Sequence, residues 1–121
     1  MANEASDVLI ELRDLVRQFA DERDWDKFHS PKNLAVSLCI EAAEVLELFQ
    51  WLPTGAPTEL SDARREQVRH ELADVLLYLV RLADKLDVDL AAATREKLAV
   101  NRTKYPPEKV RGDARKYNEY E

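Results

Sequence analysis

Apolar residues recur at helical spacing along the chain and are separated by stretches rich in polar residues and proline. The first stretch predicts a helix over residues 7–22, with Ser6 or Asp7 placed to cap its start. The second predicts a helix over residues 31–52, with Ser30 as the N-cap and proline in the first turn. Both segments are long enough to bury an apolar face against a neighbouring helix.

Two further helices follow after a loop rich in proline. One is predicted from Ser61 or Asp62 to about Leu86, and the other covers residues 90–104, with Asp89 as its cap. These elements predict an all-α four-helix bundle over residues 1–107. The apolar face of the third helix is wider than a surface helix needs, so we expect a second copy of the chain to cover part of it. The polar tail over residues 108–121 is expected to be an arm or a disordered end.

Composition narrows the classes of protein that fit this pattern. Two glycines in 121 residues argue against an all-β fold, which needs many tight turns. A formal charge of −6 argues against a nucleic-acid partner. The longest apolar runs fall well short of the ~20 residues that span a membrane, so no membrane partner is expected. The single Cys39 and the lack of a signal segment indicate a reducing, cytoplasmic setting.

Acidic residues interrupt the apolar faces of the two central helices. Glu41 lies on the core line of the helix over 31–52, and Glu44 follows one turn later. In the next helix Glu71 and Asp74 have the same spacing and share a face with Tyr78 and Arg81. If the two helices pack antiparallel, the four carboxylates meet and repel one another. A divalent hard cation would neutralise them, and ligands made only of oxygen favour Mg²⁺, with Mn²⁺ also suitable.

Each of these features also has a purely structural explanation. Acidic pairs on a helix usually face solvent, and Trp25 and Trp51 could plug the ends of the bundle as readily as they could stack on a planar base. Basic and amide groups on one face of the last helix could bind phosphate or simply stabilise the helix C-terminus. The chain contains no Glu-x-x-His motif, which disfavours a di-iron carboxylate site.

The ordered set of motifs over about residues 7–107 resembles the MazG-like superfamily of all-α nucleoside triphosphate pyrophosphohydrolases, and within it the dCTP pyrophosphatase branch. On the first helix Val16 and Phe19 depart from this pattern, because they offer no polar group to read a base. The matching segments are Glu-Arg-Asp-Trp at 22–25, Phe-His-x-Pro-x-Asn-Leu at 28–34, Glu-x-x-Glu at 41–44, Glu-Leu-Phe-Gln-Trp at 47–51, Glu-Leu-x-Asp-Val-Leu-x-Tyr-Leu at 71–79 and Lys-x-x-x-Asn-Arg-x-x-Tyr-Pro at 97–106.

The resemblance implies a hydrolase that cleaves dCTP, or a modified dCTP, between the α- and β-phosphates and thereby cleans the nucleotide pool. It also implies a dimer or a tetramer. It implies Mg²⁺ bound by Glu41, Glu44, Glu71 and Asp74, with Glu44 or Glu47 taking the proton of the attacking water. The substrate-binding residues that it implies are Trp25, His29, Trp51, Tyr78, Lys97, Asn101, Lys104 and Tyr105.

A different class of function also fits the helical pattern. A non-catalytic helical bundle could bind a nucleotide or a partner helix through the broad apolar face of the third helix. Such a protein would tolerate replacement of Glu41 and Glu71 by glutamine, and it would gain stability as the repulsion between the acids is lost. An enzyme would instead lose turnover while keeping its fold.

Overall fold

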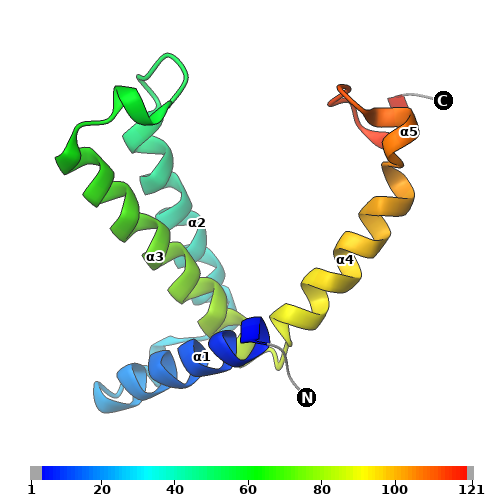
Figure 1. Cartoon of the computed structure of the whole chain (residues 1–121). Helices are drawn as coiled ribbons and strands as arrows, with labels where there is room; N and C mark the ends of the chain where they lie inside the picture. The colour runs from blue at the N-terminus through cyan, green and yellow to red at the C-terminus, as the bar shows by residue number, and fades with distance from the viewer. Residues whose placement is uncertain (1–3, 120–121) are drawn as a thin grey trace. The chain divides into compact units, whose positions relative to one another are not determined.

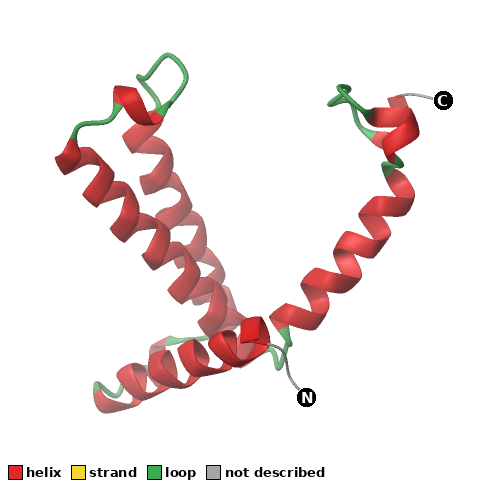
Figure 2. Ribbon diagram, in the orientation of Figure 1, coloured by secondary structure: helices red, strands yellow, loops and turns green. Residues whose placement is uncertain are grey.

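A computed structural model describes residues 4–119 of the chain. Over these residues every regular element is helical and there is no strand, which confirms the all-α class (Figure 2). The elements, in chain order, are α1 (Glu4–Glu22), η1 (Asp26–Phe28), α2 (Pro31–Phe49), η2 (Pro57–Glu59), α3 (Asp62–Lys85), α4 (Leu90–Lys104), α5 (Pro107–Val110) and η3 (Tyr117–Glu119).

Side-chain caps fix the starts of three helices where the sequence predicted them. Ser30, Ser61 and Asp89 each accept a hydrogen bond from the backbone N–H three residues ahead, at 3.2, 3.1 and 3.0 Å. A cap of this kind stabilises a helix by about 1 kcal/mol. At the end of α3, Asp87 takes a left-handed conformation with φ of 53°, which aspartate tolerates and which stops the helix.

Two predicted helix boundaries are wrong. Helix α1 spans Glu4–Glu22, so Ser6 and Asp7 lie inside the helix rather than at its start. The segment before them is rich in alanine and glutamate, which favour helix, and acidic groups are stabilising near a helix N-terminus. Helix α2 ends at Phe49, a few residues before the predicted end at about residue 52, and residues 50 and 51 form a turn.

The chain divides into two compact units at Val88 and Asp89. In the first unit α2 and α3 form an antiparallel hairpin, and α1 packs against α3 (Figure 1). This hairpin is the frame on which the acids of α2 and α3 are carried. The second unit contains α4, α5 and η3.

The tail is more regular than its composition suggested. Its described part contains α5 and η3, and the expectation that the tail is an arm or a disordered end stays a prediction. Polar contacts between residues close in sequence stabilise this segment. The Arg115 guanidinium pairs with Asp113 at 2.6 Å and donates to the carbonyl of Glu119 at 3.0 Å. Residues 120 and 121, the end of the predicted tail, lie outside the described residues.

Many large apolar side chains of the described residues face outward. Leu34 and Val80 are buried at 1% and 3% exposure, but most of the larger apolar residues are not. None of the described helices combines the length and the apolar character needed to cross a membrane. The outward-facing residues are Val8, Ile10, Leu15, Phe19, Trp25, Phe28, Val36, Ile40, Leu46, Trp51, Leu72, Leu76, Leu77, Leu79, Leu86, Val88, Leu98 and Val100.

Candidate metal centre and adjoining cavity

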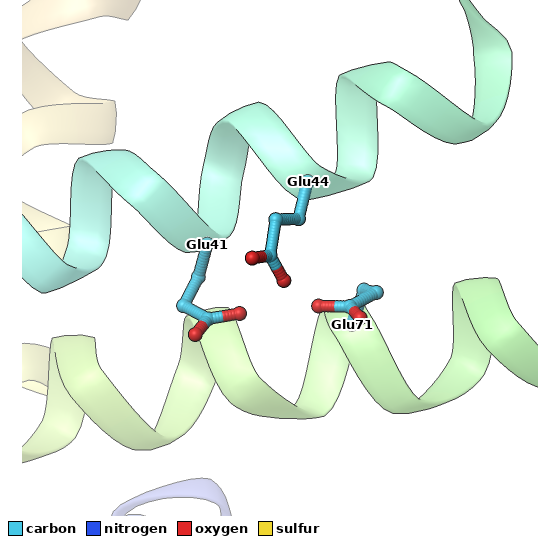
Figure 3. A group of neighbouring side chains, drawn as sticks. All are labelled: Glu41, Glu44 and Glu71. Atoms are coloured by element: carbon cyan, nitrogen blue, oxygen red, sulfur yellow. The ribbon is translucent and has the colours of Figure 1, made fainter.

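Three of the predicted acids meet between α2 and α3. Glu41 and Glu44 point down from α2 toward Glu71 on α3 (Figure 3). One carboxylate oxygen from each residue lies within 4.8 Å of the other two. The antiparallel hairpin therefore brings together, from two segments distant in sequence, the oxygens that a hard cation takes as ligands.

Two of the three acids lack hydrogen-bond partners within the described protein for one of their oxygens. One oxygen of Glu41 and one of Glu71, Oε2 in both cases, are buried and have no hydrogen-bond partner in the described part of the chain. Buried polar atoms are nearly always paired, so such orphaned acceptors need an explanation. A bound cation supplies one, and a set made only of carboxylate oxygens suits Mg²⁺ or Mn²⁺.

The nearby carboxylates also change the ionisation of Glu41. The pKa of Glu41 is raised from its ordinary value of 4.5 to about 7. Burial of the carboxyl is the largest cause, followed by the negative charge of Glu44, the adjacent carboxyl of Glu71 and the charge of Asp74. Without a cation this group therefore holds its proton more firmly than an ordinary glutamate does.

The raised pKa of Glu41 predicts how the metal-free protein responds to pH. Between pH 4.5 and about 7 the folded state binds a proton that the unfolded state has released, so this group makes the free energy of unfolding fall as pH rises. We expect Glu41→Gln to raise the melting temperature in EDTA at about pH 8 by roughly 3–6 °C, the equivalent of ~1 kcal/mol. At about pH 5 the gain should be smaller. Equal melting of variant and parent at pH 8 would contradict this account.

The other two predicted acids lie outside this group of three. Asp74 is half-buried on α3, acts on Glu41 through its charge, and lines a neighbouring cavity. Glu47 is exposed on α2, one turn beyond Glu44. The prediction that Asp74 binds metal and the prediction that Glu47 takes a proton both stay predictions.

A cavity of about 380 Å³ adjoins Asp74. Its α1 wall is apolar, whereas the opposite wall on α3 and the connector between α1 and α2 carry polar groups. Trp25 packs edge-on against Phe19, with ring centroids 5.7 Å apart and planes at 73°. The lining residues are Leu15, Val16, Phe19, Ala20, Trp25, His29, Asp74, Leu77, Tyr78 and Arg81.

The structure thus brings Trp25, His29 and Tyr78 to one cavity, but not Trp51. Trp51 follows the end of α2 with 87% of its surface exposed, and it is not among the cavity's lining residues. The remaining predicted substrate residues belong to the second unit, where Lys97 is exposed and the others are half-buried on or just after α4: Asn101, Lys104 and Tyr105.

Sequence reasoning missed one part of this site. Arg81 shares the acid face of α3, and its side chain is only 4% exposed, yet its spacing suggested no role. It pairs with Asp26 at 2.8 Å and with Asp84 at 3.3 Å. A lone arginine between apolar residues of one helix is the signal that could have revealed it, because such a charge needs buried partners.

The chain is similar to several known proteins. A family model described as "MazG-like family" matches residues 36–120. The chain is 44% identical over 113 residues to human dCTP pyrophosphatase 1 and 43% identical to the bovine protein of that name, and it is covered to 92% in both matches. It spans about two thirds of these relatives' length, 66% and 67%.

A solved structure is also similar. A pyrophosphatase from Archaeoglobus fulgidus superposes with a TM-score of 0.74 at 40% identity, covering 88% of this chain and 96% of that one. The family match covers well over half of the residues and includes the hairpin that carries the acids. The chain therefore belongs to the MazG-like family.

Proposed function

We propose that this chain is a Mg²⁺-dependent nucleoside triphosphate pyrophosphohydrolase that converts dCTP to dCMP and pyrophosphate. The observation that carries the proposal is the pair of buried, unpartnered carboxylate oxygens on Glu41 and Glu71, beside a cavity of about 380 Å³. Cavities of roughly 300–1,000 Å³ are typical of sites for small ligands. The names of the relatives supply the substrate class, since two of them are dCTP pyrophosphatases.

The residues of the centre have distinct proposed roles. Glu41, Glu44 and Glu71 would hold the cation, with Asp74 as a fourth acid acting from the cavity side. When bound, a divalent cation offsets the negative charge of the phosphate oxygens and lowers the pKa of water. Glu47 lies outside the ligand group, so we assign it to accept the proton of the attacking water, with Glu44 as the alternative.

The base of the nucleotide would enter the cavity. Trp25 is 44% exposed and lines the cavity, and stacking of a base on an aromatic ring contributes about 1–3 kcal/mol. Trp51 would flank the base in the assembled oligomer, because it is far more exposed than Trp25. The residues that we assign to the sugar and the phosphates are Tyr78, Lys97, Asn101, Lys104 and Tyr105.

The assay for this proposal is direct. The purified protein is incubated with each nucleoside triphosphate and Mg²⁺, and the monophosphate and pyrophosphate are measured. We expect dCTP to be the preferred substrate, EDTA to abolish turnover, and Mn²⁺ to restore it. Release of no pyrophosphate from any triphosphate, at enzyme concentrations approaching those of the substrate, would overturn the proposal and favour the non-catalytic bundle.

We also propose that a second copy of the chain covers the apolar face of α3. Leu72, Leu76 and Leu79 follow one another at helical spacing and are 54%, 39% and 38% exposed. Exposed apolar patches of this kind mark interfaces in soluble proteins. Burying the exposed part of each leucine would contribute about 0.5–1.5 kcal/mol.

Sedimentation at micromolar concentration tests the assembly. We expect a mass of two or four times 14.0 kDa for the parent and a shift toward the single chain for Leu76→Glu. Arg69→Glu, at an exposed and charged position of the same helix, is the matched control and should leave the mass unchanged. A parent protein that sediments as a single chain would contradict the proposed oligomer.

The setting that fits this proposal is the cytoplasm. Cys39 is exposed and is the chain's single cysteine, so no intrachain disulfide is available. Thiols of this kind stay reduced in the cytoplasm, where nucleoside triphosphates are also found.

A further inference from the structure

Arg81 is the most deeply buried charge described in the first unit, and it lines the cavity. Its Nη2 donates to Asp26 at 2.8 Å and its Nη1 to Asp84 at 3.3 Å. Its Nε donates to Nδ1 of His29 at 3.1 Å. Each nitrogen of the guanidinium therefore has a partner, and the side chain is held in one orientation.

The bond to Arg81 determines where His29 carries its proton. A guanidinium only donates hydrogen bonds, so Nδ1 of His29 must accept and cannot carry a hydrogen. The neutral ring then has its single N–H at Nε2. Burial and the nearby charges of Arg81 and Lys85 also lower the pKa of His29, against the opposing effect of Asp26.

Among the polar side chains that line the cavity, His29 offers a donor held in one tautomer. The described residues provide no acceptor for its Nε2–H, whereas the Asp74 carboxylate acts on Glu41 through its charge and is assigned to the cation. The α1 wall, with Val16 and Phe19, adds neither a donor nor an acceptor side chain. The polar contacts to a ligand in this cavity therefore come from α3 and from the connector between α1 and α2.

We propose that Arg81 is a positioning residue that fixes His29 as its Nε2–H tautomer, so that His29 donates to a ring acceptor of an amino-bearing base. This inference rests on the proposed function. Cytosine presents its ring nitrogen N3 and its O2 as acceptors, which the Nε2–H of His29 matches. In uracil and thymine N3 carries a hydrogen, so it cannot accept from His29.

The tautomer can be observed without substrate. The chain has two histidines, and His70 is exposed on α3, so ¹⁵N-histidine labelling of the full-length protein gives an internal control. Long-range ¹H–¹⁵N correlation spectra at neutral pH should show His29 as the neutral Nε2–H form alone. A protonated ring, an Nδ1–H form or a mixture at His29 would overturn the proposal, whether or not any triphosphate is hydrolysed.

Variants of His29 test whether its side chain recognises the base. Glutamine can accept from Arg81 through its carbonyl oxygen and donate through its amide, whereas phenylalanine can do neither. We expect His29→Phe to lower the ratio of kcat/KM for dCTP to that for dTTP by about 10-fold, and His29→Gln to retain most of it. An unchanged ratio in His29→Phe, in a parent that hydrolyses dCTP, would overturn this inference and leave the proposed function standing.

Two arginine variants distinguish the positioning of His29 by Arg81 from a general contribution of Arg81 to stability. Arg81→Met should give a mixture of His29 tautomers and the same loss of discrimination as His29→Phe. Arg17→Met is the matched control: Arg17 also pairs with Asp84, at 2.5 Å, but makes no bond to His29. It should retain both the tautomer and the substrate ratio. If Arg81→Met does not fold, the His29→Phe and His29→Gln variants and the histidine spectrum of the parent protein still test the proposal.

Discussion

Glu71→Gln is expected to lower turnover of dCTP by about 100-fold or more while the helical fold is retained. Glutamine keeps the size of the side chain but removes the negative charge that would hold a cation. One oxygen of Glu71 is buried without a hydrogen-bond partner in the described protein, so we expect the fold to tolerate loss of the charge. Loss of one electrostatic contact to a transition state costs about 10²–10³ in rate.

The rate is measured as pyrophosphate release at saturating Mg²⁺, and the fold by circular dichroism. Glu66→Gln is the matched control, because Glu66 is an exposed acid on α3 that pairs with Arg69 at 2.8 Å. It should retain the parent's activity. A Glu71→Gln variant with the parent's turnover would show that this carboxylate does not take part in catalysis.

Arg81→Met is expected to destabilise the chain by about 3–5 kcal/mol. The substitution leaves Asp84, whose side chain is 13% exposed, and Asp26 without their shared partner. The two acids retain Arg17 and Lys85 respectively, which places the expected loss toward the lower end of that range. Natural domains have a total stability of about 5–15 kcal/mol, so this loss is a large fraction of it.

Urea unfolding followed by circular dichroism measures that loss. Arg69→Met is the control, because the Arg69 side chain is 73% exposed and its pair with Glu66 is solvated. An exposed ion pair contributes about 0–1 kcal/mol, so this control should unfold close to the parent. A similarly small change for Arg81→Met would mean that the buried network does not stabilise the packing of α1 and the connector on α3.

The parts of the fold that depend on local chemistry were predictable from the sequence. Ser30, Ser61 and Asp89 start helices because their side chains bond to the backbone three residues ahead. The start of α1 was not predictable in this way, because residues that can cap a helix are also tolerated inside it. The turns near Asp113 form through local ion pairs, which hydrophobic periodicity does not detect.

The candidate site was also predictable from the sequence only in part. Glu41 and Glu71 were found because an acid on an apolar face contradicts the helical pattern, and packing of the hairpin then brought them together. The separate place of Asp74, on the cavity side, depends on side-chain directions that spacing alone does not give. The bond between Arg81 and His29 joins residues 52 positions apart, so only the packed structure reveals it.

The most direct test of the central claim is crystallography of the protein soaked with Mn²⁺ and a dCTP analogue that resists hydrolysis between the α- and β-phosphates. The account predicts an anomalous Mn²⁺ peak bonded to the carboxylates of Glu41, Glu44 and Glu71, with the base in the cavity beside Trp25. Analogue bound with no Mn²⁺ peak among these three carboxylates, or Mn²⁺ held elsewhere in the chain, would contradict it.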